Sequence, residues 1–275
     1  MATLVETDDV TILIDPAASL APRRFGLPPH QRELKALEVS WSAIKEGSKM
    51  ADVIIVTHYH YDHHSPRRDL DIYKDKVVLV KHPNDRINWS QRRRAAHFLG
   101  LLKGIPSSLE YADGREFSFG GTSIRFSHPL PHGLNDKLGY VLSVAIDDGE
   151  DRFVFTSDVE GAPLEEHLDF ILSSEPTILM IDGPQSYMLG FRYSHEDLLK
   201  SLANMEAIVR ASIPLRDLIV DHHLLRDVSW RERIWNVVES AEKRGIRLFC
   251  AAEYLGREVS LLEARRKELY SNERR

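Results

Sequence analysis

The sequence contains only one cysteine, Cys250, among its 275 residues. A single cysteine cannot form an intramolecular disulfide, and it excludes metal sites built from several thiolates. No apolar run reaches the roughly 18–20 residues that cross a bilayer. The first residues also lack the basic and apolar stretches of a signal peptide. These absences predict a cytoplasmic protein, kept in a reducing compartment and not bound to a membrane.

Positive charge is not in excess either. The chain has 36 Lys and Arg against 42 Asp and Glu, which gives a net charge of −6 with neutral histidine. This balance argues against non-specific binding to nucleic acid, although it leaves room for a local basic patch. Hydrophobic residues make up 43% and charged residues 28%, as in ordinary globular proteins. The length suits one large domain or two small ones.

Short apolar segments and amphipathic segments follow one another along the chain. The first half ends in hairpins, the second half alternates helix and strand, and no linker-like composition separates them. We therefore predict an α/β (α+β) protein with a single domain over residues 1–275, in which helices cover two mixed sheets in a four-layer αββα sandwich. The predicted elements used below are strands at 52–56, 178–181 and 218–220, a helix at 90–103 capped by Ser90, and a last helix at 261–270.

Thirteen histidines are the unusual feature of the composition, and several are clustered. The predicted strand 52–56 runs directly into the pattern His58-x-His60-x-Asp62-His63. Residues two apart in an extended segment point the same way, so His58 and His60 can reach one ion. A turn after His60 would send Asp62 and His63 to a second ion. Because ligands bind at strand ends in open α/β sheets, this pattern predicts a metal site.

Further histidines and an acid follow other apolar strands. His128 and His132 come after a hairpin strand, Asp158 stands at another strand end, and His222 and His223 follow the strand 218–220. We expect these strand ends to converge on one rim of the sandwich, which would bring the side chains to the same site.

The order of these residues resembles that of the metallo-β-lactamase superfamily. The resemblance runs from Asp15, which is similar to the early acid that supports the metal loop, to His222. The whole pattern is most similar to an uncharacterised archaeal family of predicted metal-dependent hydrolases. The stretches that carry this similarity are residues 22–30, 58–64, 131–133, 157–161 and 221–227.

The resemblance implies a set of metal ligands. Related nucleases place the fourth histidine seven residues before a glycine that opens the next strand. His132 precedes Gly139 by seven residues, whereas His128 precedes it by eleven, so His132 is preferred. The last histidine follows the polar residue that ends a strand, here Asp221, which selects His222. The implied set is His58, His60 and His132 on one ion, Asp62, His63 and His222 on the other, and Asp158 bridging.

Other polar residues are candidates for holding the ligands or contacting substrate. Asp221 is expected to hold a ligand ring, Asp182 to form the pocket wall, and His223 to face substrate or hold a ligand. His64 is expected to be exposed or to cap a helix. The residues in supporting or substrate roles are Asp15, His128, Asp182, Asp221 and His223. The run Arg92–Arg94 is interpreted as a solvated helix face, with phosphate contact as the alternative.

Imidazole and carboxylate ligands suit two zinc ions, and manganese or iron would also accept them. Two ions about 3.5–4 Å apart can hold a bridging hydroxide at neutral pH, which is the expected nucleophile. Asp62 is the expected proton shuttle, as in the nucleases that the site resembles. The sequence thus predicts a dinuclear metal-dependent hydrolase.

The residues leave the substrate open. A small-molecule or short phosphodiester substrate is one alternative, and a thioester, a lactone or another carbonyl compound is the second. Nucleic acid stays an alternative that the net charge does not favour. A metal-binding protein without catalytic activity is the remaining functional alternative. The number of subunits is also left open.

Overall fold

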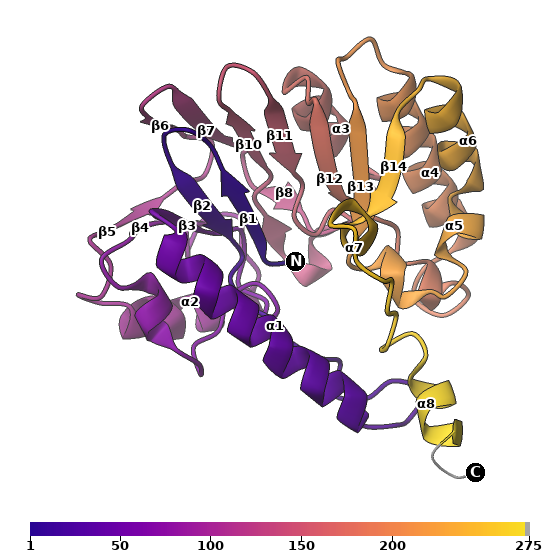
Figure 1. Ribbon diagram of the computed structural model, residues 1–275, viewed down its shortest axis with the longest axis horizontal. Coiled ribbons are helices and arrows are strands. Elements are labelled where there is room, and N and C mark those ends of the chain that lie inside the picture. The colour runs from indigo at the N-terminus through magenta and orange to yellow at the C-terminus, as the bar shows by residue number, and fades with distance from the viewer. Residues whose placement is uncertain (273–275) are drawn as a thin grey trace. The chain divides into compact units, whose positions relative to one another are not determined.

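The computed structural model describes residues 1–272, which fold into two compact units (Figure 1). The first unit comprises Met1–Thr122 and the segment that starts at Leu262, and the second comprises Ser123–Leu261. The single domain over residues 1–275 stays a prediction. Within the described residues, no helix combines the length and the apolar character needed to cross a membrane.

The first unit is built on a sheet whose strands follow the order β1-β2-β3-β4-β5. β1 and β2 are antiparallel, whereas β2 to β5 run parallel. All four residues of β3 are buried, which explains why its sequence is a continuous apolar run. The strands are β1 (Thr3–Glu6), β2 (Thr11–Ile14), β3 (Val53–Val56), β4 (Val77–Val80) and β5 (Ser108–Tyr111), and β6 (Glu116–Phe119) follows them.

Helices α1 (Gln31–Met50) and α2 (Trp89–Leu101) pack on this sheet, together with the short η1 (Leu70–Tyr73). Trp41 of α1 and Phe98 of α2 belong to one apolar cluster with Ile54 and Val78 of the sheet. Burying such side chains contributes about 1.5–3 kcal/mol each.

The start predicted for the second helix is wrong. The structure begins α2 at Trp89 and caps it with Asn88, whose side-chain oxygen accepts a hydrogen bond from the Gln91 backbone N–H at 2.8 Å. Ser90, the predicted cap, lies inside the first turn. Asparagine and serine satisfy a helix N-terminus equally well, so the sequence could not decide between them.

The second unit is built on a mixed sheet whose strands follow the order β14-β13-β12-β11-β10-β7. β7, β10 and β11 are antiparallel, and β11 to β14 are parallel. The carboxyl ends of β11, β12 and β13 therefore share one edge. The strands are β7 (Thr122–Phe126), β10 (Val144–Asp147), β11 (Arg152–Phe155), β12 (Ile178–Asp182), β13 (Asp217–Asp221) and β14 (Arg247–Cys250), with a separate pair β8 (Leu130–Pro131) and β9 (Tyr140–Val141).

Helices cover this sheet as well. Phe170 of α3 and Met205 of α4 join one apolar cluster with Leu179, Ile181 and Val220 of the sheet. The mixed α/β class predicted from the sequence is confirmed. The helices of this unit are α3 (Glu165–Ser173), α4 (His195–Arg210), α5 (Trp230–Arg233), α6 (Trp235–Lys243) and α7 (Ala251–Tyr254), and the short 3-10 helices are η2 (Asp136–Leu138), η3 (Ser186–Met188) and η4 (Leu224–Arg226).

The last helix returns to the first unit. It is α8 (Arg266–Asn272), so the helix predicted at 261–270 starts five residues later than expected. The Arg266 side chain is fully buried and its Nε and Nη2 atoms each lie 2.8 Å from the Glu33 carboxylate. Its Nη1 donates to the backbone oxygens of Ala21 and Leu27. This arginine thus joins α1, α8 and the loop between β2 and α1.

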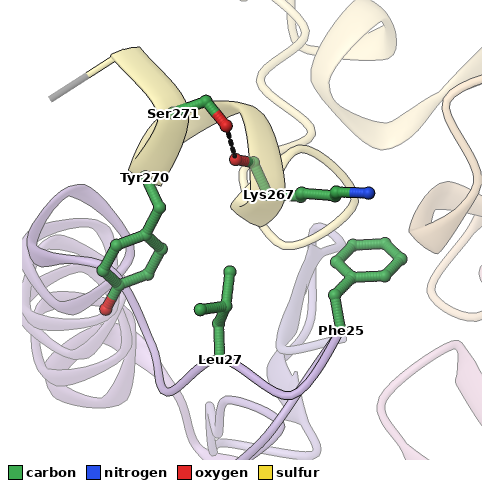
Figure 2. Close-up of a pocket in the computed structure, with 5 residues that line it drawn as sticks. All are labelled: Phe25, Leu27, Lys267, Tyr270 and Ser271. Atoms are coloured by element: carbon green, nitrogen blue, oxygen red, sulfur yellow. Dashed lines mark hydrogen bonds between the residues drawn. The ribbon is translucent and has the colours of Figure 1, made fainter. Parts of the chain in front are cut away.

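A cavity of about 330 Å³ lies between that loop and α8. Figure 2 shows Phe25 and Leu27 of the loop facing Tyr270 and Lys267 of the helix. The Ser271 hydroxyl donates to the Lys267 backbone oxygen at 2.9 Å. The hydrogen bonds from Arg266 to Ala21 and Leu27 tie the loop at residues 16–30 to α8.

We predict that the Arg266→Met variant lowers the free energy of unfolding by about 3–5 kcal/mol, because the Glu33 carboxylate is then buried without its counter-ion. Urea denaturation followed by circular dichroism measures the change. Lys49→Met is the control, since Lys49 pairs with Glu46 at an exposed position. Equal midpoints for the two variants would show that the buried pair contributes nothing.

Candidate metal centre

The His-x-His-x-Asp-His pattern forms the loop that leaves β3. The backbone oxygen of His60 accepts hydrogen bonds from the backbone N–H groups of His63 and His64, so the chain turns directly after His60. The ring centroid of His58 lies 4.6 Å from that of His60 and 4.0 Å from that of His63. Three imidazoles of this short loop are therefore close together.

Asp15 follows β2, the parallel neighbour of β3, and its carboxylate contacts this loop. Its Oδ2 atom lies 2.7 Å from His63 Nδ1 and accepts a hydrogen bond from the Thr57 hydroxyl, also at 2.7 Å. Its Oδ1 atom accepts from the Thr57 backbone N–H. With Nδ1 of His63 directed to a carboxylate, Nε2 is the nitrogen that remains for a metal. Asp15, His58 and His63 offer ligand atoms within 4.8 Å of one another.

Tyr59 fixes the same loop through hydrogen bonds of its side chain and its backbone. Its hydroxyl donates to the backbone oxygen of Lys81 at the end of β4, and its backbone oxygen lies 3.4 Å from Nη1 of Arg94 in α2. Sequence reasoning missed this residue. The alternation His58-Tyr59-His60 was the available signal, because neighbours in an extended segment point to opposite sides.

The expectation for His64 is wrong. This histidine is buried, its Nδ1 lies 2.8 Å from the His60 backbone oxygen, and its ring packs against Phe98. Burial lowers the pKa of His64 to about 4, which keeps the ring neutral. Because the His64 ring packs in the core of the first unit, this residue neither faces solvent nor caps a helix.

A second group of candidate ligands lies in the second unit. Asp158 follows β11 and His222 follows β13, so parallel strand ends bring them together. One oxygen of Asp158, Oδ2, lies 3.1 Å from His132 Nε2 and 3.5 Å from His222 Nε2. His222 adopts a left-handed φ of 61°, an uncommon conformation for a residue with a side chain. His128 is exposed, so the structure brings His132 and not His128 to Asp158.

Glu160 is a residue of this group that sequence reasoning missed. Its Oε1 atom lies 3.3 Å from His132 Nδ1 and accepts a hydrogen bond from Gln185. Burial lowers the pKa of His132, but the hydrogen bonds to Asp158 and Glu160 outweigh it and raise that pKa to about 10. Gly133 makes room for Glu160, because a Cβ atom there would lie 2.3 Å from the Glu160 Cδ atom. Because this approach joins residues that are distant in the sequence, no local pattern indicated the role of Glu160.

Asp182 ends β12 and holds His223. Its Oδ2 atom lies 2.9 Å from His223 Nδ1, and it also accepts the backbone N–H groups of His223 and Glu160. Burial, together with the charge of Asp158, raises the pKa of Asp182 to about 7. Asp221 accepts from the His222 backbone N–H at 2.6 Å. In this unit it is therefore Asp182, and not Asp221, that holds a histidine ring.

The side chains of both units fit divalent metal ions. The donors are imidazole nitrogens and carboxylate oxygens, which suit zinc, manganese or iron. In three cases a carboxylate faces Nδ1 of the ring and leaves Nε2 for a ligand, which is the usual arrangement around metal-binding histidines. These pairs are His63 with Asp15, His132 with Glu160, and His223 with Asp182.

Comparison with known proteins gives concordant results. The family model of the metallo-beta-lactamase superfamily matches residues 1–234. A UPF0282 protein of Metallosphaera sedula is 50% identical over 99% of this chain and 88% of its own length. A UPF0282 protein of Sulfurisphaera tokodaii is 52% identical over 99% and 89%. The structure resembles a possible metal-dependent hydrolase of Veillonella parvula with a TM-score of 0.53 and 10% identity, over 89% of this chain and 92% of that one.

We predict that His132→Ala weakens zinc binding by more than about tenfold, whereas His128→Ala leaves it unchanged, because His132 and not the exposed His128 contacts Asp158. Competition with a chromogenic chelator measures both affinities. Equal effects of the two substitutions would contradict the choice of His132.

Proposed function

The chain belongs to the metallo-β-lactamase superfamily, and from this membership we propose that it is a dinuclear metal-dependent hydrolase. The observation that carries the proposal is the Asp158 oxygen that faces Nε2 of both His132 and His222. A carboxylate between two imidazoles is what a residue that bridges two ions requires. The proposed ligands are His58, His60 and His132 for one ion, Asp62, His63 and His222 for the other, and Asp158 for both.

Two bound divalent ions, most simply zinc, would supply a hydroxide at neutral pH and polarise the substrate oxygen. The protein's own residues keep the ligand atoms in place. Asp15 holds the His63 ring through Nδ1, and Glu160 lies against Nδ1 of His132. Asp62 is proposed to carry the proton from the nucleophile to the leaving group, since it stands beside His63 in the same loop.

A phosphodiester is the substrate we favour, and the spacing of His132 before Gly139 supports it because nucleases of the superfamily share it. The cytoplasm is the location that the single cysteine favours. Hydrolysis of a thioester or a lactone is the competing outcome of the test below.

The test is a hydrolysis panel of bis(p-nitrophenyl) phosphate, a thioester and a lactone, measured before and after metal removal with a chelator and again after zinc is added. We expect phosphodiester turnover that the chelator abolishes and zinc restores. His60→Ala and Asp158→Ala should each reduce kcat/KM by at least about 100-fold, because each removes a metal ligand.

His128→Ala is the matched control and should keep wild-type turnover, since His128 is an exposed histidine outside the candidate ligands. Turnover of only the thioester or the lactone would replace the phosphodiester by a carbonyl substrate. Metal binding without turnover of any of the three would contradict the hydrolase and favour a metal-binding protein.

A further inference from the structure

We propose that Arg67 and Arg94 bind a phosphate group of the substrate, which makes that substrate an anionic phosphate ester and not a neutral carbonyl compound. This inference rests on the proposed hydrolase function and names its substrate class. The structural basis is a cluster of three side chains in the first unit, Tyr61, Arg67 and Arg94, which we call the arginine cluster.

The arginine cluster is centred on the metal loop itself. Tyr61 stands between His60 and Asp62, two of the proposed ligands, and its side chain is 39% exposed. The guanidinium carbon of Arg94 lies 4.7 Å from the centre of the Tyr61 ring, and that of Arg67 lies 5.5 Å from it. Two cations from different segments therefore meet at one residue of the loop.

The charges of these two arginines are not compensated in their own unit. Among the described residues of the first unit, no carboxylate lies within ion-pair distance, 4.0 Å, of Arg67 or Arg94. Arg68 provides the contrast, because its guanidinium makes two hydrogen bonds to the Glu38 carboxylate at 2.8 and 3.1 Å. Neighbouring arginines with the same stem thus differ in whether their charge is neutralised. Guanidinium groups that have no protein carboxylate are suited to bind phosphate in a bidentate manner.

The segment that precedes Arg94 in the sequence is also rich in arginine. Residues 86–94 contain four arginines and no acidic residue, in a chain whose net charge is −6. Arg93 lies 4.8 Å from the ring centre of Trp89, which is 70% exposed. Proteins that bind single-stranded nucleic acid combine exposed aromatic rings, on which bases stack, with arginines that contact the phosphates. The phosphate can therefore come from a small ester or from a single-stranded oligonucleotide.

Arg94 also contacts the Tyr59 backbone oxygen, so its alternative role is purely structural, namely to stiffen the metal loop. The two roles predict different substrate dependence. A residue that binds phosphate acts on the negative charge of the substrate, whereas a residue that stiffens the metal loop acts on every substrate and on the bound metal.

The experiment compares Arg67→Gln, Arg94→Gln and the double variant with Arg68→Gln as the matched control. Each is assayed with bis(p-nitrophenyl) phosphate, which is anionic, and with a neutral phosphotriester of the same leaving group. We expect each single variant to raise KM for the diester by about tenfold, since a charge-assisted hydrogen bond is lost. We expect kcat for the diester, kcat/KM for the triester and the zinc content to stay within about twofold, and Arg68→Gln to resemble the wild type.

Binding of a fluorescent single-stranded RNA oligonucleotide and of a nucleoside monophosphate is measured in parallel at several salt concentrations. Competition by the monophosphate alone would identify a small ester, and tight oligonucleotide binding would identify a strand. In either case the double variant should bind more weakly. The number of counterions released on binding, obtained from the slope of log affinity against log salt concentration, should fall by about two.

Three results would overturn the inference. These are equal losses on the diester and the triester, loss of zinc in the arginine variants, or effects of Arg68→Gln as large as those of Arg67→Gln. If the wild type hydrolyses nothing, the proposed function fails, and the binding measurement still tests the arginine cluster. Wild-type protein that binds neither phosphate ligand, or binds them as well after both substitutions, contradicts it.

Discussion

The candidate metal centre depends on carboxylates that hold imidazole rings through their Nδ1 atoms. A histidine ring can rotate and can carry its proton on either nitrogen, so it presents a defined ligand atom only when the other nitrogen is occupied. Asp15 does this for His63, a proposed ligand, and Asp182 does it for His223, which follows the proposed ligand His222, each with an oxygen within 3.0 Å of Nδ1. Both carboxylates are fully buried, where a hydrogen bond is stronger than it is in water. The ring orientations are thus built into the core of each unit.

The sheets explain how side chains distant in sequence reach these positions. Parallel strands end at the same edge, which places Asp15 beside the loop after β3 and Asp158 beside Asp182 and His222. The connecting loops leave the strands through strained backbone, because Asp15, Ser157 and His222 all have positive φ values. Strain of this kind costs about 1–3 kcal/mol for each residue and persists only where surrounding contacts enforce it. Its presence at all three of these strand ends agrees with a functional site.

Part of this arrangement could be predicted from local sequence. The apolar run Val53–Val56 predicts a buried strand. The choice of His132, which contacts Asp158, came instead from the resemblance to superfamily nucleases, through its spacing before Gly139. The mixed α/β class also follows from the pattern of segments. The resemblance to the metallo-β-lactamase superfamily supplied the ligand order, and the family match confirms that membership.

The remaining features depend on tertiary contacts that leave no local signature. Asp182 and His223 are 41 residues apart in sequence, so nothing near either residue indicates their hydrogen bond. Glu160 reads as an ordinary loop acid until Gly133 is seen against its carboxylate. His64 looks like a polar residue after a motif, yet its ring is part of an aromatic cluster with Tyr59 and Phe98. Sequence patterns report the direction of a side chain within its own segment, and they do not report its partner in the fold.

The most direct test of the account is the number of metal ions that the protein holds. Untagged protein, saturated with zinc and then dialysed, is analysed by elemental mass spectrometry against its concentration from amino-acid analysis. A centre in which Asp158 bridges two ions should retain about two ions per chain. A protein that retains no metal after this treatment would contradict the proposed metal centre.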